Sequence, residues 1–136
     1  MLVYSDGACM PAGRLTYRVD DGILVLTAVG SPSSADRRAT FDKIRTDPQV
    51  PDGALLLLDT RRLTDVMTSL EGERRLSELL AGLGLKMGAR CAVLASGANP
   101  AATHFFQAAG RAYGVRVGLF DNEAAARLWL TASLRA

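Results

Sequence analysis

The sequence predicts a single α/β domain, with a mostly parallel sheet of about five strands, an antiparallel hairpin at its start and four helices. Two observations predict this class. Residues 15–29 hold two strand-like segments separated by Asp20-Asp21-Gly22, which is a hairpin turn signal. After them, apolar runs alternate with amphipathic helical segments, a pattern typical of parallel strands joined by right-handed crossovers.

The first elements are a leader and the hairpin. Residues 1–13 are expected to form a flexible N-terminal leader, and residues 14–136 the domain. Leu15–Val19 alternates apolar and polar residues, as a half-buried strand does, and Ile23–Val29 is a more apolar second strand. A surface helix to about residue 46 follows, with Ser31 as its expected N-cap and Pro32 at its first position.

The central stretch is a strand followed by a helix. Ala54–Leu58 is an unbroken apolar run that suits a strand buried on both faces, and Asp59 is expected to end it. A short polar connection then leads to Thr68-Ser69-Leu70-Glu71, in which Thr and Glu have the spacing of a capping box. The helix that follows carries leucines on one face, namely Leu76, Leu79, Leu80 and Leu83.

The remaining elements are a buried strand over residues 90–95, a helix from Asn99-Pro100 to Gly114, a strand over residues 115–120 and a final helix. Asp121 is expected to cap that final helix. Leu128 and Trp129 are expected to anchor it to the core.

Composition excludes several classes of protein. Of 136 residues, 49% are hydrophobic and 22% charged, with a formal net charge of +2, which is typical of a globular protein and does not indicate a nucleic-acid or anionic-membrane partner. No apolar run is long enough to span a bilayer, and the first residues do not form a secretion signal. We therefore expect a cytoplasmic protein in which Cys9 and Cys91 are reduced thiols.

The sequence offers little for catalysis or metal binding. Its single histidine, His104, falls opposite the apolar face of its helix, and the two cysteines lack ligand spacing. We expect no metal, no cofactor and no catalytic residue. An enzyme would need a second titratable group close to Asp59, and the sequence shows no clear candidate.

The connection after the central strand holds the candidate binding residues. Asp59 occupies a position that carries function in many α/β proteins, although an ordinary turn-forming role at the strand end is the favoured explanation. Arg61 and Arg62 are candidates to bind an anion together with the following helix N-terminus, or are ordinary exposed arginines. Thr68 and Ser69 either cap the helix or accept a phosphate there.

The pattern resembles the STAS superfamily with its SpoIIAA-like fold, over residues 15–134. The resemblance rests on the opening hairpin and on three segments, LLLLDTRRLTD, RCAVLAS and VRVGLFDNEAAARLWL. In the anti-sigma-factor antagonist branch, the central strand leads to Asp-Ser-Ser-Gly or Asp-Ser-Thr-Gly, whose first Ser is phosphorylated by a partner kinase. The matching positions are Met67, Thr68, Ser69 and Leu70, so only the hydroxyls are kept. The sequence is more similar to the SEC14-like branch, which generally lacks this switch and whose name suggests lipid binding.

We therefore expect a non-enzymatic regulatory or protein-interaction module that works through residues 59–70. The alternative is a binder of a small apolar or anionic, lipid-like ligand at the same place, with Met67 and Leu70 in a pocket and Arg61 or Arg62 at its mouth. The partner is not identified by the sequence. A homodimer through the edge strand of the hairpin is also compatible with it.

Overall fold

The computed structural model describes residues 13–64, 68–96 and 100–132, and it confirms the predicted α/β class. Within these residues the sheet has five strands in the order β1-β2-β3-β4-β5. β1 pairs with β2 in antiparallel orientation, and every later pairing is parallel. The strands are β1 (Arg14–Asp20), β2 (Ile23–Gly30), β3 (Ala54–Leu63), β4 (Met87–Leu94) and β5 (Arg116–Phe120). The helices are α1 (Ser34–Thr46), α2 (Ser69–Leu83), the short 3-10 helix η1 (Gly84–Lys86), α3 (Pro100–Ala112) and α4 (Glu123–Ala132).

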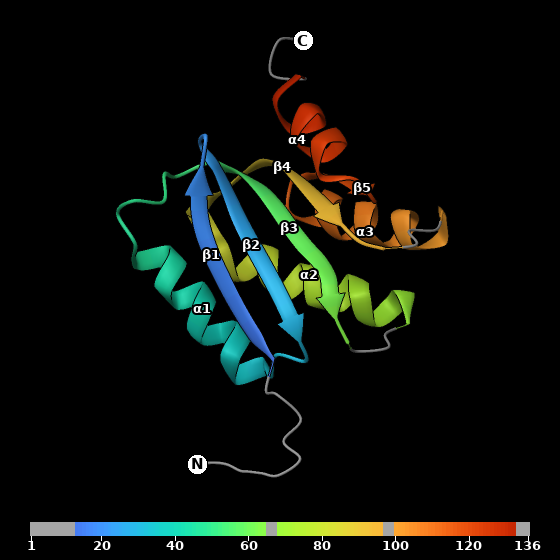
Figure 1. Ribbon diagram of the computed structural model, residues 1–136, viewed down its shortest axis with the longest axis horizontal. Coiled ribbons are helices and arrows are strands. Elements are labelled where there is room, and N and C mark those ends of the chain that lie inside the picture. The colour runs from blue at the N-terminus through green and yellow to red at the C-terminus, as the bar shows by residue number, and fades with distance from the viewer. Residues whose placement is uncertain (1–12, 65–67, 97–99, 133–136) are drawn as a thin grey trace.

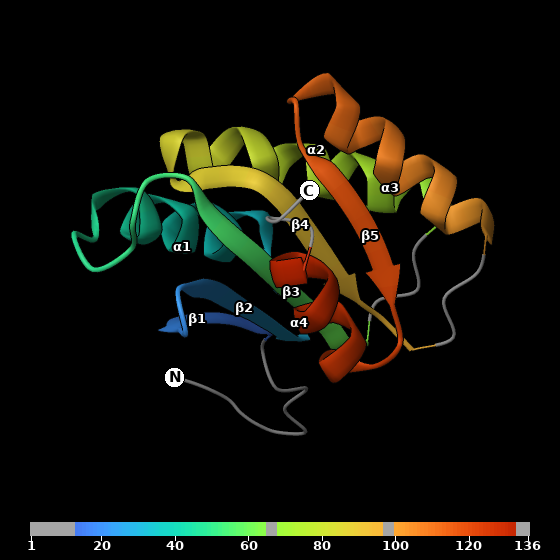
Figure 2. The same cartoon turned by 90° about the horizontal axis from the view of Figure 1, so that it is seen from above.

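The helices cover the two faces of the sheet unequally. Helices α1, α2 and α3 lie on one face, and α4 lies alone on the other (Figures 1 and 2). Successive residues of β2 and β3 alternate between these faces, so that Leu24 and Leu56 join the three-helix core while Val25 and Leu57 join the core under α4. The central strands are therefore buried on both faces, as their apolar runs predict.

Helix α2 packs unusually close to its neighbours. A Cβ added at Gly72 would lie 2.9 Å from the Phe106 ring on α3, and one added at Gly82 would lie 2.7 Å from the Phe41 ring on α1. These distances are too short for a real side chain, so the two glycines allow both aromatic rings to lie directly against the α2 backbone. The three helices thus form a continuous layer over the sheet.

Helix α1 begins two residues later than the sequence predicts. Ser33, rather than Ser31, is the N-cap: its hydroxyl accepts a hydrogen bond from the Asp36 backbone N–H at 3.0 Å. The Asp36 carboxylate in turn accepts one from the Ser33 backbone N–H at 3.3 Å. This capping box satisfies two helix-end donors, whereas a cap at Ser31 followed by Pro32 offers only one such bond.

The final helix, α4, also differs from the prediction, in its N-cap and in the residues that it buries. Asn122, not Asp121, stands before its first residue, and its side-chain oxygen accepts a hydrogen bond from the Ala125 N–H at 2.9 Å. The residues of α4 that face the sheet are Ala126 and Leu130, both fully buried, together with Trp129. The expectation for Leu128 is wrong: its side chain is 68% exposed, because it lies about 200° around the helix from Ala126.

The predicted leader over residues 1–13 lies outside the described residues, except for Gly13. The Gly13 backbone lies directly against the backbone of Ser31 and Pro32, and a Cβ at this position would overlap with it. The chain therefore enters β1 beside the point where β2 passes into α1.

Candidate functional site

The candidate site lies at the edge where the parallel strands end. Strands β2, β3, β4 and β5 all point towards this edge, and α1, α2 and α3 begin there (Figures 1 and 2). In α/β folds the crevice outside the carboxyl ends of the strands is the usual place for a ligand. Of the predicted site residues, Asp59, Arg61 and Arg62 lie near the end of β3, and Thr68 and Ser69 lie at the start of α2.

A cavity of about 400 Å³ opens here between the sheet and the three-helix layer. Its volume falls within the range of small-molecule sites. Most of its described lining residues are apolar: Leu15, Leu26, Ala28, Pro32, Phe41, Leu58, Leu63, Leu76, Leu79, Val93, Ala95, Ala102, Phe106 and Leu119. The polar ones are Thr60, Thr68, Ser96, Arg37, Arg61 and Arg75. Among the described lining residues none is acidic.

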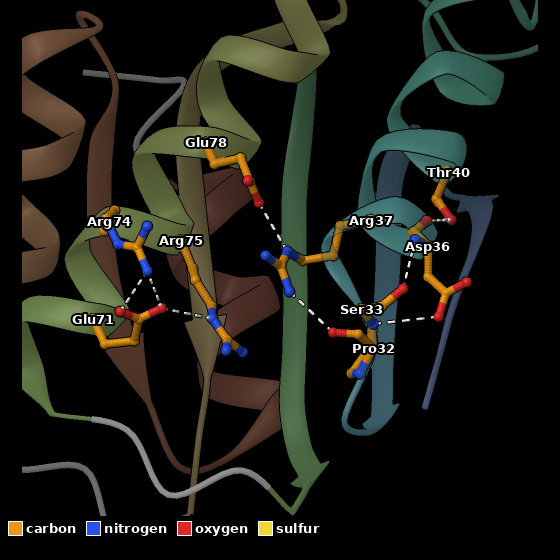
Figure 3. Close-up of polar contacts among 9 residues, drawn as sticks. All are labelled: Pro32, Ser33, Asp36, Arg37, Thr40, Glu71, Arg74, Arg75 and Glu78. Carbon is orange, nitrogen blue, oxygen red and sulfur yellow. Dashed lines mark hydrogen bonds and ion pairs between the residues drawn. The ribbon is translucent and has the colours of Figure 1, made fainter. Parts of the chain in front are cut away.

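Two of the lining arginines come from the helices above the cavity. Arg37 of α1 donates from Nε to the Glu78 carboxylate of α2 at 2.8 Å, and from Nη1 to the Pro32 carbonyl at 2.9 Å. Arg75 of α2 donates from Nε to the Glu71 carboxylate at 3.1 Å. Figure 3 shows the Arg37 guanidinium between α1 and α2, and the Arg75 guanidinium below α2 beside the Glu71 carboxylate. Positive charge from two helices is thus brought to one side of the cavity.

The third lining arginine is held differently. Arg61 donates from Nη2 to the Asp59 carboxylate at 2.9 Å and lies 3.5 Å from a Glu123 oxygen on α4. The hydrogen bond from the Arg61 side chain is the largest influence holding the pKa of Asp59 below its usual value, and the Arg61 backbone N–H adds to it. Asp59 is thus partnered by Arg61 through both backbone and side chain, in agreement with the turn-like interpretation of this carboxylate.

The predicted loop after Asp59 is wrong in its boundaries. β3 continues to Leu63, so that Asp59, Arg61 and Arg62 belong to the strand. The reason is β2, which runs alongside to Gly30 and pairs with Arg62 and Leu63 after a shift in register near Thr27. The register shift falls between Asp59 and Arg62, where three steps along β3 lie opposite two along β2. The anion-binding role of Arg61 and Arg62 stays a prediction.

The start of α2 agrees with the prediction in part. Thr68 is the N-cap, and its hydroxyl accepts a hydrogen bond from the Glu71 N–H at 3.1 Å. The Glu71 carboxylate contacts Arg74 and Arg75, and the hydrogen bond from Arg74 is the main reason that the pKa of Glu71 is lowered. Met67 lies outside the described residues, and Ser69 is the first residue of α2. Leu70 is 66% exposed and is not a lining residue of the cavity.

Comparisons with known proteins bear on the fold. No protein-family model matches the chain, and no curated protein matches it. The chain is similar in structure to an uncharacterized protein of the DUF3478 family with a SpoIIAA-like fold from Shewanella loihica PV-4, with a TM-score of 0.63 and 15% identity over 91% of this chain and 98% of that one. It is also similar to an anti-sigma factor antagonist from Mycobacterium paratuberculosis, with a TM-score of 0.51 and 17% identity over 87% of this chain and 93% of that one. The chain has a SpoIIAA-like fold.

The predicted resemblance is therefore confirmed at the level of the fold. The cavity is formed by side chains of this SpoIIAA-like domain.

Sequence reasoning missed Arg37 and Arg75, which line the cavity. A usable signal was present: Arg37 precedes Phe41 by four residues and Ile44 by seven, which places it on the buried face of its helix. Arg75 precedes the buried Leu79 by four residues in the same way. A cation at an apolar position of an amphipathic helix is a candidate for ligand contact.

The other groups considered from the sequence, His104 and Cys91, are not among the described lining residues of the cavity. Residues 13–64, 68–96 and 100–132 contain no cluster of three or more potential metal ligands. His104 is exposed, as its helical position predicts. Cys91 is fully buried in β4, which raises the pKa of its thiol to about 12, while Cys9 lies outside the described residues. In the same ranges no helix has the length and hydropathy that a membrane crossing requires.

Proposed function

We propose that this protein is a non-enzymatic regulatory module that binds a small, largely apolar ligand in the cavity beneath α1, α2 and α3. The cavity is the single observation that carries the proposal. The ligand-binding alternative drawn from the sequence thus takes precedence over the protein-interaction module. The proposed binding site lies in the space between the sheet and the helices, whereas the sequence placed it in the 59–70 loop.

The energetics of the cavity support a bound ligand. Removing apolar surface from water is favourable by roughly 25 cal/mol per Å², and most of the described lining is apolar. Leu26, Leu79 and Val93 are buried around the cavity. A ligand with apolar surface would therefore gain free energy from contact with this lining, at the edge of the sheet where α/β folds bind small molecules.

The lining supports binding rather than catalysis. Its described residues include no histidine, cysteine, lysine or carboxylate, the groups that most often act as acids, bases or activated nucleophiles. The Asp59 carboxylate is hydrogen-bonded to Arg61, which lowers its pKa and favours the charged form. The similarity to a protein described as an anti-sigma factor antagonist supports a regulatory role for the fold.

Binding of a neutral fluorescent dye to the purified full chain tests the proposal. N-phenyl-1-naphthylamine should bind saturably, with increased emission and about one dye per chain. Leu58→Trp should weaken this binding at least tenfold, because Leu58 is half-buried in the lining and a larger ring would fill the cavity. Leu128→Trp adds the same ring on exposed α4 and should leave binding unchanged. Absence of saturable binding, with both proteins folded by circular dichroism, would reject the proposal.

A second candidate is docking of a protein partner at the start of α2. The exposed Leu70 beside the N-cap Thr68 supports this candidate, as does the structural similarity to an anti-sigma factor antagonist. Phosphorylation of Thr68 or Ser69 would place two negative charges at the positive end of α2 and change such a surface. Asp59, Arg61 and Arg62 would flank it on β3. The interaction partner is proposed to be a protein.

Intact-mass measurement of the protein purified from its own cells tests the second candidate. A mass increase of one phosphate that is lost in Thr68→Ala or in Ser69→Ala would support a switch at this helix end. A chain of unmodified mass under every growth condition tested would reject the switch.

A further inference from the structure

We infer that the cavity ligand is a single apolar chain that ends in one anionic group, a carboxylate or a phosphate, and that Arg37 binds this group. The inference rests on the proposed function and adds the chemical class of the ligand. It also assigns a binding role to a residue that the sequence-based expectations did not include.

The lining changes in polarity from the interior to the edge of the sheet. Deep in the fold it consists of core side chains such as Leu26, Phe41 and Val93. At the carboxyl ends of the strands it includes Thr60 near the end of β3 and Ser96 beyond the end of β4. A ligand that follows this gradient has an apolar body inside and a polar group at the edge.

The charged side chains that line the cavity are arginines. The Arg61 guanidinium is paired with Asp59 and with Glu123 of α4, which leaves Arg37 and Arg75 as the candidates for ligand contact. Their carboxylate partners, Glu78 and Glu71, are not among the described lining residues.

The residues at the starts of α1, α2 and α3 also line the cavity, represented by Pro32, Thr68 and Ala102. Helix N-termini carry partial positive charge, so three helix ends add to the effect of the arginines. The polar group of the ligand is therefore anionic.

Among the arginines, Arg37 has the geometry of an anchor. Its side chain is only 17% exposed, and its contacts to Glu78 and to the Pro32 carbonyl hold the guanidinium in a defined orientation. A guanidinium has five N–H donors in a planar fork, and these two contacts use one from Nε and one from Nη1. The remaining donors suit a carboxylate or phosphate, which arginine binds in bidentate fashion. Arg75 supplies a second positive charge from α2 (Figure 3).

The volume of the cavity limits the size of the apolar part of the ligand. About 400 Å³ lies near the lower end of the range for small-molecule sites. This space suits one acyl or alkyl chain of moderate length. A lipid with two long chains would extend beyond the lining described here.

Displacement of N-phenyl-1-naphthylamine from the full-length protein tests the inference. Decanoate, decyl phosphate and 1-decanol carry the same chain with different ends. We expect at least one anion to displace the dye at about tenfold lower concentration than 1-decanol, as a hydrogen bond to a charged group implies. Preference for decanoate would identify a fatty-acid type of ligand, and preference for decyl phosphate a phosphorylated chain.

Variants then test the role of Arg37. Arg37→Gln should reduce the preference for the anion over 1-decanol to about onefold, while dye binding is kept. Arg74→Gln is the matched control, because Arg74 is 76% exposed, pairs with Glu71 and does not line the cavity. If Arg37→Gln does not fold, Arg37→Lys keeps the charge without the fork and should show an intermediate preference.

The possible failures are distinguishable. Equal displacement by 1-decanol and both anions in the wild-type protein would overturn the inference while leaving ligand binding in the cavity intact. An anion preference that survives Arg37→Gln would overturn the assignment of Arg37. Failure of the dye to bind would instead reject the proposed function itself.

Discussion

Arg37 of α1 and Glu78 of α2 form an ion pair across the gap between two helices that cover the cavity, with Nε and Oε1 2.8 Å apart (Figure 3). The two side chains are 17% and 35% exposed. Pairs that solvent reaches to this extent contribute at most about 1 kcal/mol to stability. The main consequence of the pair is therefore positional, because it orients the guanidinium at the cavity and joins α1 to α2.

Glu78→Gln should separate the effect of this ion pair on stability from its effect on ligand binding. We expect the free energy of unfolding in urea to fall by no more than about 1 kcal/mol. The affinity for decanoate should rise, because the amide oxygen of the introduced glutamine can still accept the hydrogen bond that orients Arg37, while the carboxylate charge that balances the guanidinium is removed. Asp42→Asn, which alters an ion pair with Arg45 away from the cavity lining, serves as the control and should leave decanoate binding unchanged. A loss of decanoate affinity in Glu78→Gln would contradict this account.

The hydrogen bond from the Tyr17 hydroxyl to Asp47, 2.8 Å long, joins β1 to the end of α1. It is the main cause that raises the pKa of Tyr17, and it also helps to lower the pKa of Asp47, after the Gln49 backbone N–H. The raised Tyr17 pKa means that this stabilisation is present below the unfolded value near pH 10 and is lost as the pH rises through the folded value. Because the pKa of Asp47 is lowered, the stabilisation by this hydrogen bond is also lost as the pH falls below about 4.

Tyr17→Phe should therefore destabilise the protein on the order of 1 kcal/mol at pH 7, the typical value of one hydrogen bond. The difference from wild type should shrink at both ends of the pH range. Urea unfolding at pH 3, 7 and 10.5 measures it. A difference that is independent of pH would indicate lost packing rather than the lost hydrogen bond.

The thiol of Cys91 should be unreactive in the folded protein. It is fully buried, and its pKa is raised to about 12, so almost none is present as the reactive thiolate at pH 8. In a Cys9→Ser background, iodoacetamide should leave the native protein unmodified and should add one group per chain in denaturant, as read by intact mass. Rapid native labelling would show that β4 opens on the timescale of the reaction.

The buried face of α4 can be tested by a pair of leucines. Leu130→Ala should cost about 2–5 kcal/mol of the free energy of unfolding, because Leu130 is fully buried under the sheet. Leu128→Ala should change it by less than about 0.5 kcal/mol, because Leu128 is 68% exposed. Urea unfolding of both variants measures the contrast, and similar costs would place α4 in a different rotation from the one described.

Elements specified by local patterns were predictable. The Asp20-Asp21-Gly22 turn, the apolar β3 segment from Ala54 and the Thr68 cap of α2 all appear where the sequence places them. Errors arose where two local signals competed, as at Ser31 and Ser33, and where a partner strand decided the outcome. The extension of β3 to Leu63 depends on backbone pairing with β2, which residues 59–63 do not indicate by themselves.

The sequence by itself determined the class of fold and the order of its elements, because hydrophobic periodicity, caps and turns act over a few residues. Only the tertiary structure decided where a ligand could bind. Arg37 and Arg75 lie far apart along the chain, and they meet at one cavity because α1 and α2 pack side by side on the sheet. A cavity is a relation between side chains on several elements, so it depends on how those elements are brought together in space.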